Sequence, residues 1–437
     1  MLEAEKYNFV KVSKNVQFMI FISVFVSSIV FFKEPFEFYL HYLIFLTLIP
    51  FFFLKYGYPK PIALILIAIG LVGIINVGIG YYKPFDFIKV WGGLFLSLTF
   101  YHYVLDYYKF NLVQIFKVYS VWSYYVSVIG IVQVVSYNVG FSWGYNYTWL
   151  FNKWGVIEGG LLGIRVNSIF SEPSTLAGVL APAVYISLYN LMHKKNFLIT
   201  KRQSIVILIT YVLASSSTAY LAIMLILFLV TDSLKVRYFF IGLIMGIGLY
   251  NIAYNYSEDF KYRVDTSVAS WMHQDYDIEN TNSSSFVLYN NWHVATQNIK
   301  EFPLLGSGVG SYNIAYEKHS LTKTVLNYDF EFNTTDGNSM FIRLMVETGL
   351  VGVLLFMFIV IKCFIPKRVS DVDIHYRLIS HAIVIMIMVY LLRQGNYYLN
   401  AFPFFVLMYY YNWKQYKESQ KYAFQNIVDE NLKIDEG

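Results

Sequence analysis

Residues 165–192 read RVNSIFSEPSTLAGVLAPAVYISLYNLM, and this stretch sets the class of the protein. Its later part, from about residue 172, is apolar and has the length of a membrane-spanning helix, which needs about 20 residues. Its first part is a polar loop that holds Arg165, and Glu172 stands at the junction. The stretch predicts a helix that begins at a membrane surface, with an arginine and a glutamate beside its first turn.

The composition extends the membrane prediction to the whole chain. Hydrophobic residues make up 57% and charged residues 14% of the 437 residues, whereas a soluble domain has about 45–50% and about 25%. The net charge of +5 is modest, and basic residues stand between apolar runs, which argues against a nucleic-acid partner. The single cysteine, Cys363, excludes a disulfide within the chain. We expect an all-α polytopic membrane protein.

Twelve apolar runs predict twelve membrane spans. The first run lacks a small-residue cleavage site and works better as a span than as a signal peptide. The predicted spans lie near residues 16–32, 37–54, 61–80, 85–105, 112–137, 172–192, 203–217, 219–233, 237–254, 338–363, 379–393 and 399–413.

Lysine and arginine mark the side of the membrane that each connection faces, because cytoplasmic loops are rich in both. With the N-terminus inside, almost every basic cluster between spans falls on the cytoplasmic side, and both termini are cytoplasmic. The predicted organisation is spans one to nine over residues 1–254 with an outer loop near 138–171, a large extracytoplasmic loop over 255–337, spans ten to twelve over 338–413 and a cytoplasmic tail over 414–437.

The start of the tenth span carries charges in an apolar setting. Arg343 and Glu347 are four residues apart, so they share one helix face. At about 1.5 Å per residue, Glu347 would lie roughly 13 Å below Asn338, near the middle of a core about 30 Å thick. Ionisable groups at that depth are functional candidates by default. The alternative is a structural ion pair that braces the helices.

Two predicted helices begin at the outer face, after Glu172 and after Asp336. Their N-termini would favour an anion such as a phosphate. Arg165 and Arg393, also predicted at the outer face, add positive charge there. The alternatives are a helix-start charge for Glu172 and membrane-interface anchoring for the two arginines.

The large loop adds two histidines and a glycine run. His293 and His319 are candidates for binding or proton transfer, although most such histidines are simply packed. The glycine run near residues 303–312 lacks the Lys-Ser/Thr of a phosphate loop, and we expect a tight turn between loop helices. No Cys/His or paired-carboxylate spacing predicts a metal site.

Three motifs stand in a fixed order around the predicted outer loop. They are Arg165…Phe170-Ser-Glu172-Pro173-Ser-Thr-Leu-Ala177, then Trp292…Pro303-Leu-Leu-Gly306-Ser-Gly308-Val-Gly310-Ser-Tyr312, then Asn338-Ser-Met-Phe-Ile-Arg-Leu-Met-Val-Glu347-Thr-Gly349-Leu-Val-Gly352. In order and spacing they resemble the O-antigen polymerase and ligase superfamily of bacterial inner membranes. The earlier spans resemble it only in hydropathy.

The resemblance implies a GT-C-like fold and glycosyl transfer at the outer leaflet of the inner membrane. The donor would be an oligosaccharide on undecaprenyl pyrophosphate, and arginines would hold the pyrophosphate without metal or other cofactor. Arg165 falls on a family arginine. Gly337 stands where ligases usually carry a histidine, and Ser215-Ser216-Ser217-Thr218 lacks an arginine that many members have.

These observations give a set of candidate residues. The catalytic candidates, for taking the proton of the acceptor hydroxyl, are Glu172, Asp336 and His319. Glu172 ranks first, because burial beside Phe170 and Pro173 would raise its pKa. The candidates for binding pyrophosphate or glycan are Arg165, Arg343, Arg393, Asn338, Glu347 and His293.

The leading functional hypothesis is a polymerase of oligosaccharide repeat units for O-antigen, capsule or exopolysaccharide. Its partners would be the lipid-linked oligosaccharide, the bilayer and a chain-length regulator protein. One alternative is a ligase or protein oligosaccharyltransferase of the same superfamily. Another, from a different class, is a transporter or flippase for lipid-linked glycan, although such proteins usually spread polar groups through several spans.

Overall fold

The computed structural model describes residues 9–435 except 35, 82, 231–247, 249–250, 252–253, 257, 273–282, 325–332, 367–368 and 370–372. The described part is mostly helical, as expected. Its only strands are a short antiparallel hairpin of β1 (Val30–Phe32) and β2 (Phe38–Tyr39). The predicted ninth span, 237–254, lies almost entirely outside the described residues.

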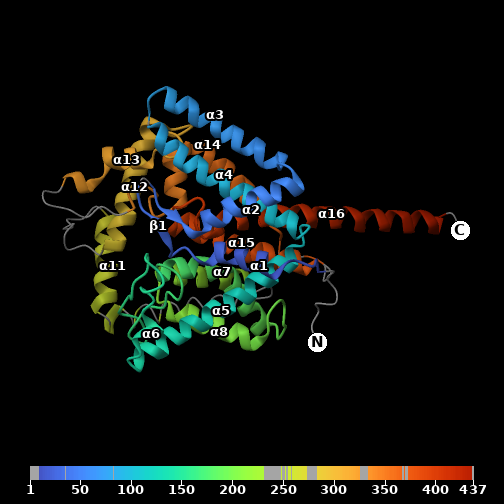
Figure 1. The fold of residues 1–437 in the computed structure, drawn as a ribbon, viewed down its shortest axis with the longest axis horizontal. Coiled ribbons are helices and arrows are strands. Elements are labelled where there is room, and N and C mark those ends of the chain that lie inside the picture. Colours follow the sequence, from blue (N-terminus) through green and yellow to red (C-terminus); the bar gives the residue numbers. More distant parts are fainter. Residues whose placement is uncertain are drawn as a thin grey trace.

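The helices follow the apolar runs closely. They are α1 (Lys14–Phe25), α2 (Leu40–Tyr56), α3 (Lys60–Gly78), α4 (Pro84–Tyr107), α5 (Leu112–Asn138), α6 (Ser142–Tyr145), α7 (Pro173–Met192), α8 (Lys201–Leu213), α9 (Ser217–Val230), α11 (Glu258–Trp271), α12 (Ser283–Glu301), α13 (Tyr312–His319), α14 (Met340–Lys362), α15 (Ile374–Arg393) and α16 (Phe402–Asp435). Figure 1 shows α11, α12 and α13 at one end of the molecule and the C-terminal part of α16 at the opposite end.

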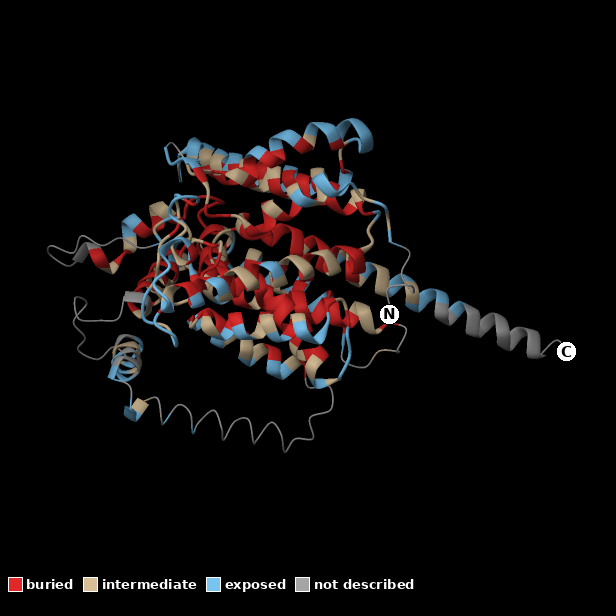
Figure 2. Cartoon of the chain, turned by 60° about the horizontal axis from the view of Figure 1, so that its bottom comes forward, coloured by how far each residue is buried: buried red, intermediate tan, exposed pale blue. Residues whose placement is uncertain are grey.

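Several described helices have the character of membrane spans. By length and composition, α3, α5, α7, α14 and α15 are able to cross a membrane, and α1, α2 and α9 are shorter apolar helices. The outward face of α3 is apolar, with Leu64 at 70% and Ile67 at 57% exposure (Figure 2). An apolar face of this kind suits contact with lipid. The structure supports a multi-pass membrane protein, while the count of twelve spans and their orientation stay predictions.

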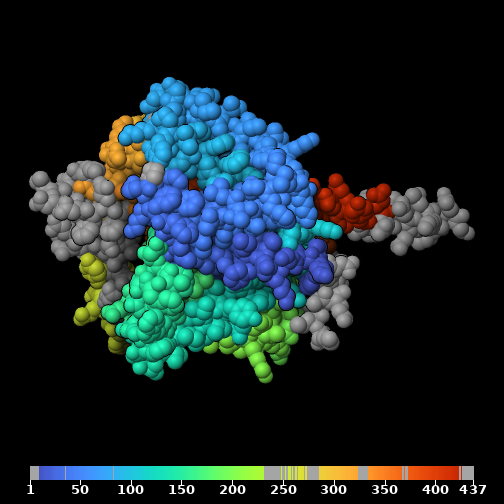
Figure 3. All heavy atoms as spheres, in the orientation of Figure 1, coloured from blue at the N-terminus to red at the C-terminus, as the bar shows by residue number. Residues whose placement is uncertain are grey.

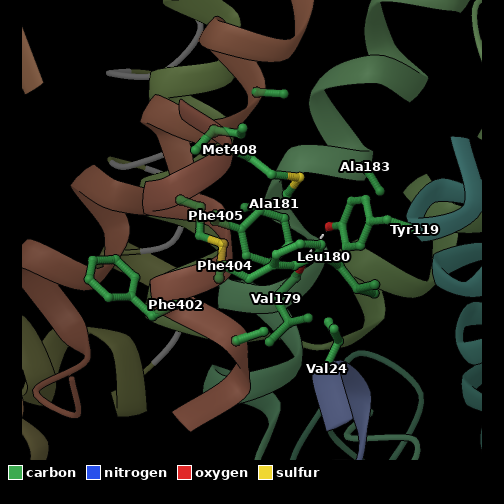
Figure 4. Close-up of a cluster of buried hydrophobic side chains, with 14 of the residues drawn as sticks. Val24, Tyr119, Val179, Leu180, Ala181, Ala183, Phe402, Phe404, Phe405 and Met408 are labelled. Carbon is green, nitrogen blue, oxygen red and sulfur yellow. Dashed lines mark hydrogen bonds between the residues drawn. The ribbon is translucent and has the colours of Figure 1, made fainter. Parts of the chain in front are cut away.

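The core is built around α7, which is buried along nearly its whole length. Its neighbours include α5 and α16, whose aromatic side chains enclose it (Figure 4). Pro182 lies inside α7 and removes one helical hydrogen bond. Tyr119 and Tyr211 donate hydrogen bonds to the carbonyls of Val179 and Ala177, one turn earlier. The two buried tyrosine hydroxyls are thereby paired inside the apolar bundle.

Helix α14 is broken at Gly349, where φ is 60° and ψ is −163°. The glycine run between α12 and α13 pairs with the break. The amides of Ser307 and Gly308 donate to the carbonyls of Val346 and Glu347, at 2.9 and 3.0 Å. The predicted turn between loop helices is present, and it also completes the backbone pairing of a broken helix, which the sequence did not indicate. On the other side of the break, the amides of Leu350 and Val351 donate to the carbonyls of Pro303 and Leu304.

The same loop docks on the bundle beside the α3–α4 turn. Asn313 donates to Asp86 at 3.4 Å, and the Phe302 and Tyr81 rings are 4.8 Å apart. The loop and the α14 break therefore lie at one end of the bundle, which we call the outer end. In Figure 3, the N-terminal helices, drawn in blue, extend over the upper part of the visible face from the outer end toward the opposite end.

Replacing Gly349 with alanine tests the break. A Cβ at this position would lie 2.5 Å from the Leu304 carbonyl oxygen, and the positive φ disfavours any side chain. We expect Gly349→Ala to lower stability by about 1–3 kcal/mol, measured as thermal unfolding in detergent. Gly92→Ala is the matched control, because nothing lies within 4 Å of its Cβ and alanine favours a helix. Equal stability of both variants would contradict the packing argument.

Cysteine labelling tests the orientation. In a Cys363→Ser background, a cysteine at exposed Glu317 of α13 should react with a membrane-impermeant maleimide in intact spheroplasts. A cysteine at exposed Lys195, between α7 and α8, should react only after permeabilisation. Glu317 is preferable to a residue such as Asn291, which is fully buried. The opposite labelling pattern would invert the proposed topology.

Candidate functional site

Arg343 and Glu347 form a buried ion pair on the first half of α14. Arg343 Nε donates to Glu347 Oε1 at 2.9 Å, and the two side chains are 4% and 0% exposed. Arg343 Nη1 donates to the Gly395 carbonyl at 3.0 Å, and the guanidinium lies 4.2 Å from the Tyr397 ring centre. The pair thus binds α14 to the loop that follows α15.

The pair lies close to the loops at the outer end of the bundle. Gly395 and Tyr397 follow the end of α15, and the loop after α12 reaches the carbonyl of Glu347. The break at Gly349 comes after Glu347, so α14 is continuous from Met340 to this residue. The depth of Glu347 in the membrane stays a prediction.

A tight turn prepares the start of α14. Gly337 and Asn338 both have positive φ, at 65° and 54°. Asp336 Oδ1 accepts from the Asn338 amide at 3.1 Å and from Asn333 Nδ2 at 3.1 Å. A Cβ on Gly395 would lie 1.8 Å from the Asp336 carbonyl oxygen. Asp336 and Asn338 are therefore close to the loop that receives Arg343, and Asp336 is already engaged in the turn.

Arg165 and Arg393 lie beside the same turn, between α8 and α9. The Val166 amide, next to Arg165, donates to the Leu213 carbonyl at 3.1 Å. Arg393 Nη2 donates to Ser217 Oγ at 3.3 Å. Both arginine side chains are partly exposed. The backbone next to Arg165 and the side chain of Arg393 thus contact the two ends of one turn.

Glu172 caps the outer end of α7 without burial. Its side chain is exposed and accepts a hydrogen bond from Ser174 Oγ at 2.9 Å. The sequence argument for a proton-accepting Glu172 required partial burial beside Phe170, and that premise is wrong, because Phe170 points into the core instead. Its helix does lie beside Arg393's helix, since Gly178 of α7 packs on Tyr390 of α15.

The two loop histidines belong to the packing of the outer loop. His319 Nε2 lies 3.5 Å from Glu301 Oε1. Burial and nearby Lys318 lower the pKa of His319, against the opposing effect of Glu301. His293 is half-buried on α12, whose neighbouring Trp292 stacks on Phe341 at the start of α14.

Sequence reasoning missed a polar cluster at the β1–β2 hairpin. It assigned residues 37–39 to a membrane span, but α2 begins only at Leu40. Lys153 Nζ donates to both oxygens of Glu37, at 2.8 and 2.6 Å, and contacts the Tyr39 hydroxyl at 2.7 Å. Burial raises the pKa of Glu37, but hydrogen bonds from Lys153 and Tyr39 outweigh it and leave the pKa below its ordinary value. The sequence did contain one indication of this cluster, because Glu37 is a charged residue at the start of an apolar run.

The hairpin cluster reaches the Arg343 region through aromatic rings. Tyr42 of α2 lies 6.2 Å from Tyr398, which follows Tyr397 in the loop after α15. Tyr398 is within electrostatic range of Arg343, Glu347 and Asp336. Segments from both halves of the chain therefore meet at the outer end.

Comparison with known proteins adds a family to this geometry. No curated protein matches the chain. Residues 203–357 match a family model described as O-Antigen ligase. The matched region runs from α8 to α14 and includes two of the three motifs, while the Arg165 motif precedes it. This match over residues 203–357 supports the predicted O-antigen polymerase and ligase superfamily.

Proposed function

We propose that the protein is a membrane glycosyltransferase that polymerises oligosaccharide repeat units linked to undecaprenyl pyrophosphate. The reaction takes place at the outer leaflet of the bacterial inner membrane, for O-antigen, capsule or exopolysaccharide. The observation that carries the proposal is the gathering of Arg165 and Arg393 at the α8–α9 turn. The family match supports the class of enzyme.

The arginines act on the leaving group. Cleavage of a sugar–pyrophosphate bond builds negative charge on the pyrophosphate, and fixed cations in a preorganised site stabilise that charge. Guanidinium groups bind phosphate oxygens in a two-pronged manner. The N-terminus of α7 adds a positive dipole end beside them. Direct attack by a sugar hydroxyl of the acceptor inverts the anomeric centre, and the proposed mechanism uses no metal.

Arg343 plays a different part in this proposal. Its donors are engaged by Glu347 and Gly395, and its face is covered by Tyr397. A guanidinium used in this way fixes the loop 394–398 and so sets the position of Arg393. The turn formed by Asp336 and Asn338 packs against Gly395 of the same loop. Arg343 and Glu347 therefore brace the site, and Arg165 and Arg393 bind the pyrophosphate.

A ligase is the second candidate, and the match described as O-Antigen ligase fits both activities equally. Gly337 stands at the position where the resemblance leads us to expect a ligase histidine. The turn conformation there, with φ at 65°, favours glycine over a histidine. This observation favours the polymerase, which transfers glycan to a second lipid-linked unit. A flippase is less well supported, because the candidate charges gather at one end of the bundle.

Substitution of Arg165 tests the proposed function. We expect Arg165→Ala to reduce polymer formation at least about 100-fold at near-normal protein abundance, the scale of losing one oxyanion-binding group. Arg165→Lys should rescue poorly, because an ammonium lacks the paired donors of a guanidinium. The measurement is the length distribution of glycan made from a defined lipid-linked repeat unit. Arg202→Ala, at an exposed arginine of α8, is the control.

The glycan made by a deletion strain separates the alternatives. Loss of a polymerase leaves single repeat units capped on the acceptor lipid. Loss of a ligase abolishes capping, and loss of a flippase leaves lipid-linked units at the inner leaflet. Full activity of Arg165→Ala would reduce Arg165 to a membrane-interface anchor.

The brace makes a prediction about stability. Removing either Arg343 or Glu347 leaves a buried charge without its partner, which should cost about 3–5 kcal/mol. A paired apolar replacement, Arg343→Met with Glu347→Leu, should recover most of that loss, as measured by thermal unfolding in detergent. Retained polymer formation in the double variant is expected for a brace. Recovered stability with no activity would instead make the pair part of the substrate site.

A further inference from the structure

His41 is a fully buried histidine with no role so far. It lies in the first turn of α2, is 2% exposed, and neither ring nitrogen has a hydrogen-bond partner among the described residues. The Tyr39 ring stacks on it at 5.2 Å, and the Tyr42 and Phe45 rings lie at 4.5 and 5.4 Å. An imidazole enclosed by three rings thus keeps its donor and its acceptor unused.

Such an arrangement is unfavourable unless another group visits the site. Buried polar groups are nearly always hydrogen-bonded, and an unmet one costs stability. His381 of α15 shows the usual solution in this same chain. Its Nδ1 lies 3.1 Å from the Tyr185 hydroxyl, and its Nε2 lies 2.9 Å from the Ile365 carbonyl. Two buried histidines therefore differ in one respect: His381 is paired and His41 is not.

The position of His41 connects it to the proposed site. It follows the hairpin, whose Tyr39 hydroxyl is held by Lys153 and Glu37. Tyr42, its neighbour in sequence, contacts Tyr398 in the loop that also receives Arg343. His41 is thus two ring contacts away from the loop that begins after Arg393. None of these hairpin residues falls within the matched region 203–357.

We propose that His41 binds the acceptor hydroxyl of the glycosyl transfer and takes its proton; this inference rests on the proposed function. The hydroxyl oxygen forms the bond to the anomeric carbon with the electron pair of its O–H bond. The bond between that carbon and the pyrophosphate oxygen breaks, and its electron pair stays on the pyrophosphate. The proton passes to the free ring nitrogen of His41 and then to water.

The other candidates for this role are already engaged. Glu172 is exposed to solvent, Asp336 accepts two hydrogen bonds within its turn, and His319 faces Glu301. Among these four, only His41 is a fully buried residue with no hydrogen bond to any polar side-chain atom in the described structure. A sugar hydroxyl both donates and accepts, as does a neutral imidazole, so the two are complementary.

Access to His41 runs past Tyr39. The Tyr39 ring covers the imidazole, while its hydroxyl contacts the half-exposed Lys153–Glu37 pair at the surface. An arriving acceptor displaces this ring and takes its place over the imidazole. The Lys153–Glu37 pair keeps Tyr39 closed over His41 when no acceptor is bound.

The test separates stability from turnover. His41→Phe removes two unmet polar atoms, so the variant should unfold at the same temperature as the parent or higher. Its turnover of a defined lipid-linked repeat unit should fall about 100-fold or more, the range of a lost general base. His381→Phe is the matched control. It should unfold at a lower temperature, because it loses two hydrogen bonds, while its folded fraction keeps normal turnover.

His41→Gln distinguishes proton transfer from simple binding. The amide keeps a hydrogen-bonding atom near the ring Nε2 but does not accept a proton, so KM should stay near the parental value while kcat falls. Parental turnover in either the Phe or the Gln variant would overturn the proposal. If His41→Phe does not fold, the Gln variant decides. An inactive parent chain, or an active Arg165→Ala variant, would contradict the proposed function itself and not the role of His41.

Discussion

Peptide groups in a membrane protein have no water to bond with, so a broken helix survives only where the protein itself pairs with the break. This constraint governs the outer end of the structure. Helix α14 breaks at Gly349, and the loop over residues 303–308 supplies hydrogen-bond donors on one side and acceptors on the other. The outer loop is therefore a structural part of the bundle, and its glycine run exists to allow backbone to approach backbone.

The charges before the break are paired as well. Arg343 and Glu347 would carry a high cost in desolvation if they were left unpaired. They lie beside Gly395 and Tyr397, where a carbonyl and an aromatic face complete the pairing. Their ion pair then fixes the loop after α15, whose first residues neighbour Arg393. In the proposed function, Arg343 holds the loop after α15 and thereby positions the guanidinium of Arg393 at the α8–α9 turn.

Hydropathy and motif order predicted the helical membrane class, most helix positions and the family, because these depend on local composition and spacing. They did not predict which polar groups meet. The break of α14 was missed because it depends on a single glycine, Gly349, and no periodicity reveals a positive φ. The prediction that Glu172 is buried failed because the Phe170 side chain points into the core, whereas the Glu172 side chain is exposed. The hairpin at residues 30–39 was absorbed into two predicted spans, since its strands are too short and too apolar to interrupt a run.

The hairpin shows why the matched region is not the whole site. Residues 203–357 hold the break, the loop and the Arg343–Glu347 pair, but Arg165, Lys153 and the hairpin precede them, and Arg393 follows. A donor pyrophosphate and an acceptor sugar need separate contacts, since one carries charge and the other carries only hydroxyl groups. The arginines at the α8–α9 turn suit the first, and the aromatic enclosure around His41 suits the second. If the proposed function holds, specificity for the acceptor should depend on the helices that precede residues 203–357. Recognition of pyrophosphate should depend on Arg165, which precedes this matched region, and on Arg393, which follows it.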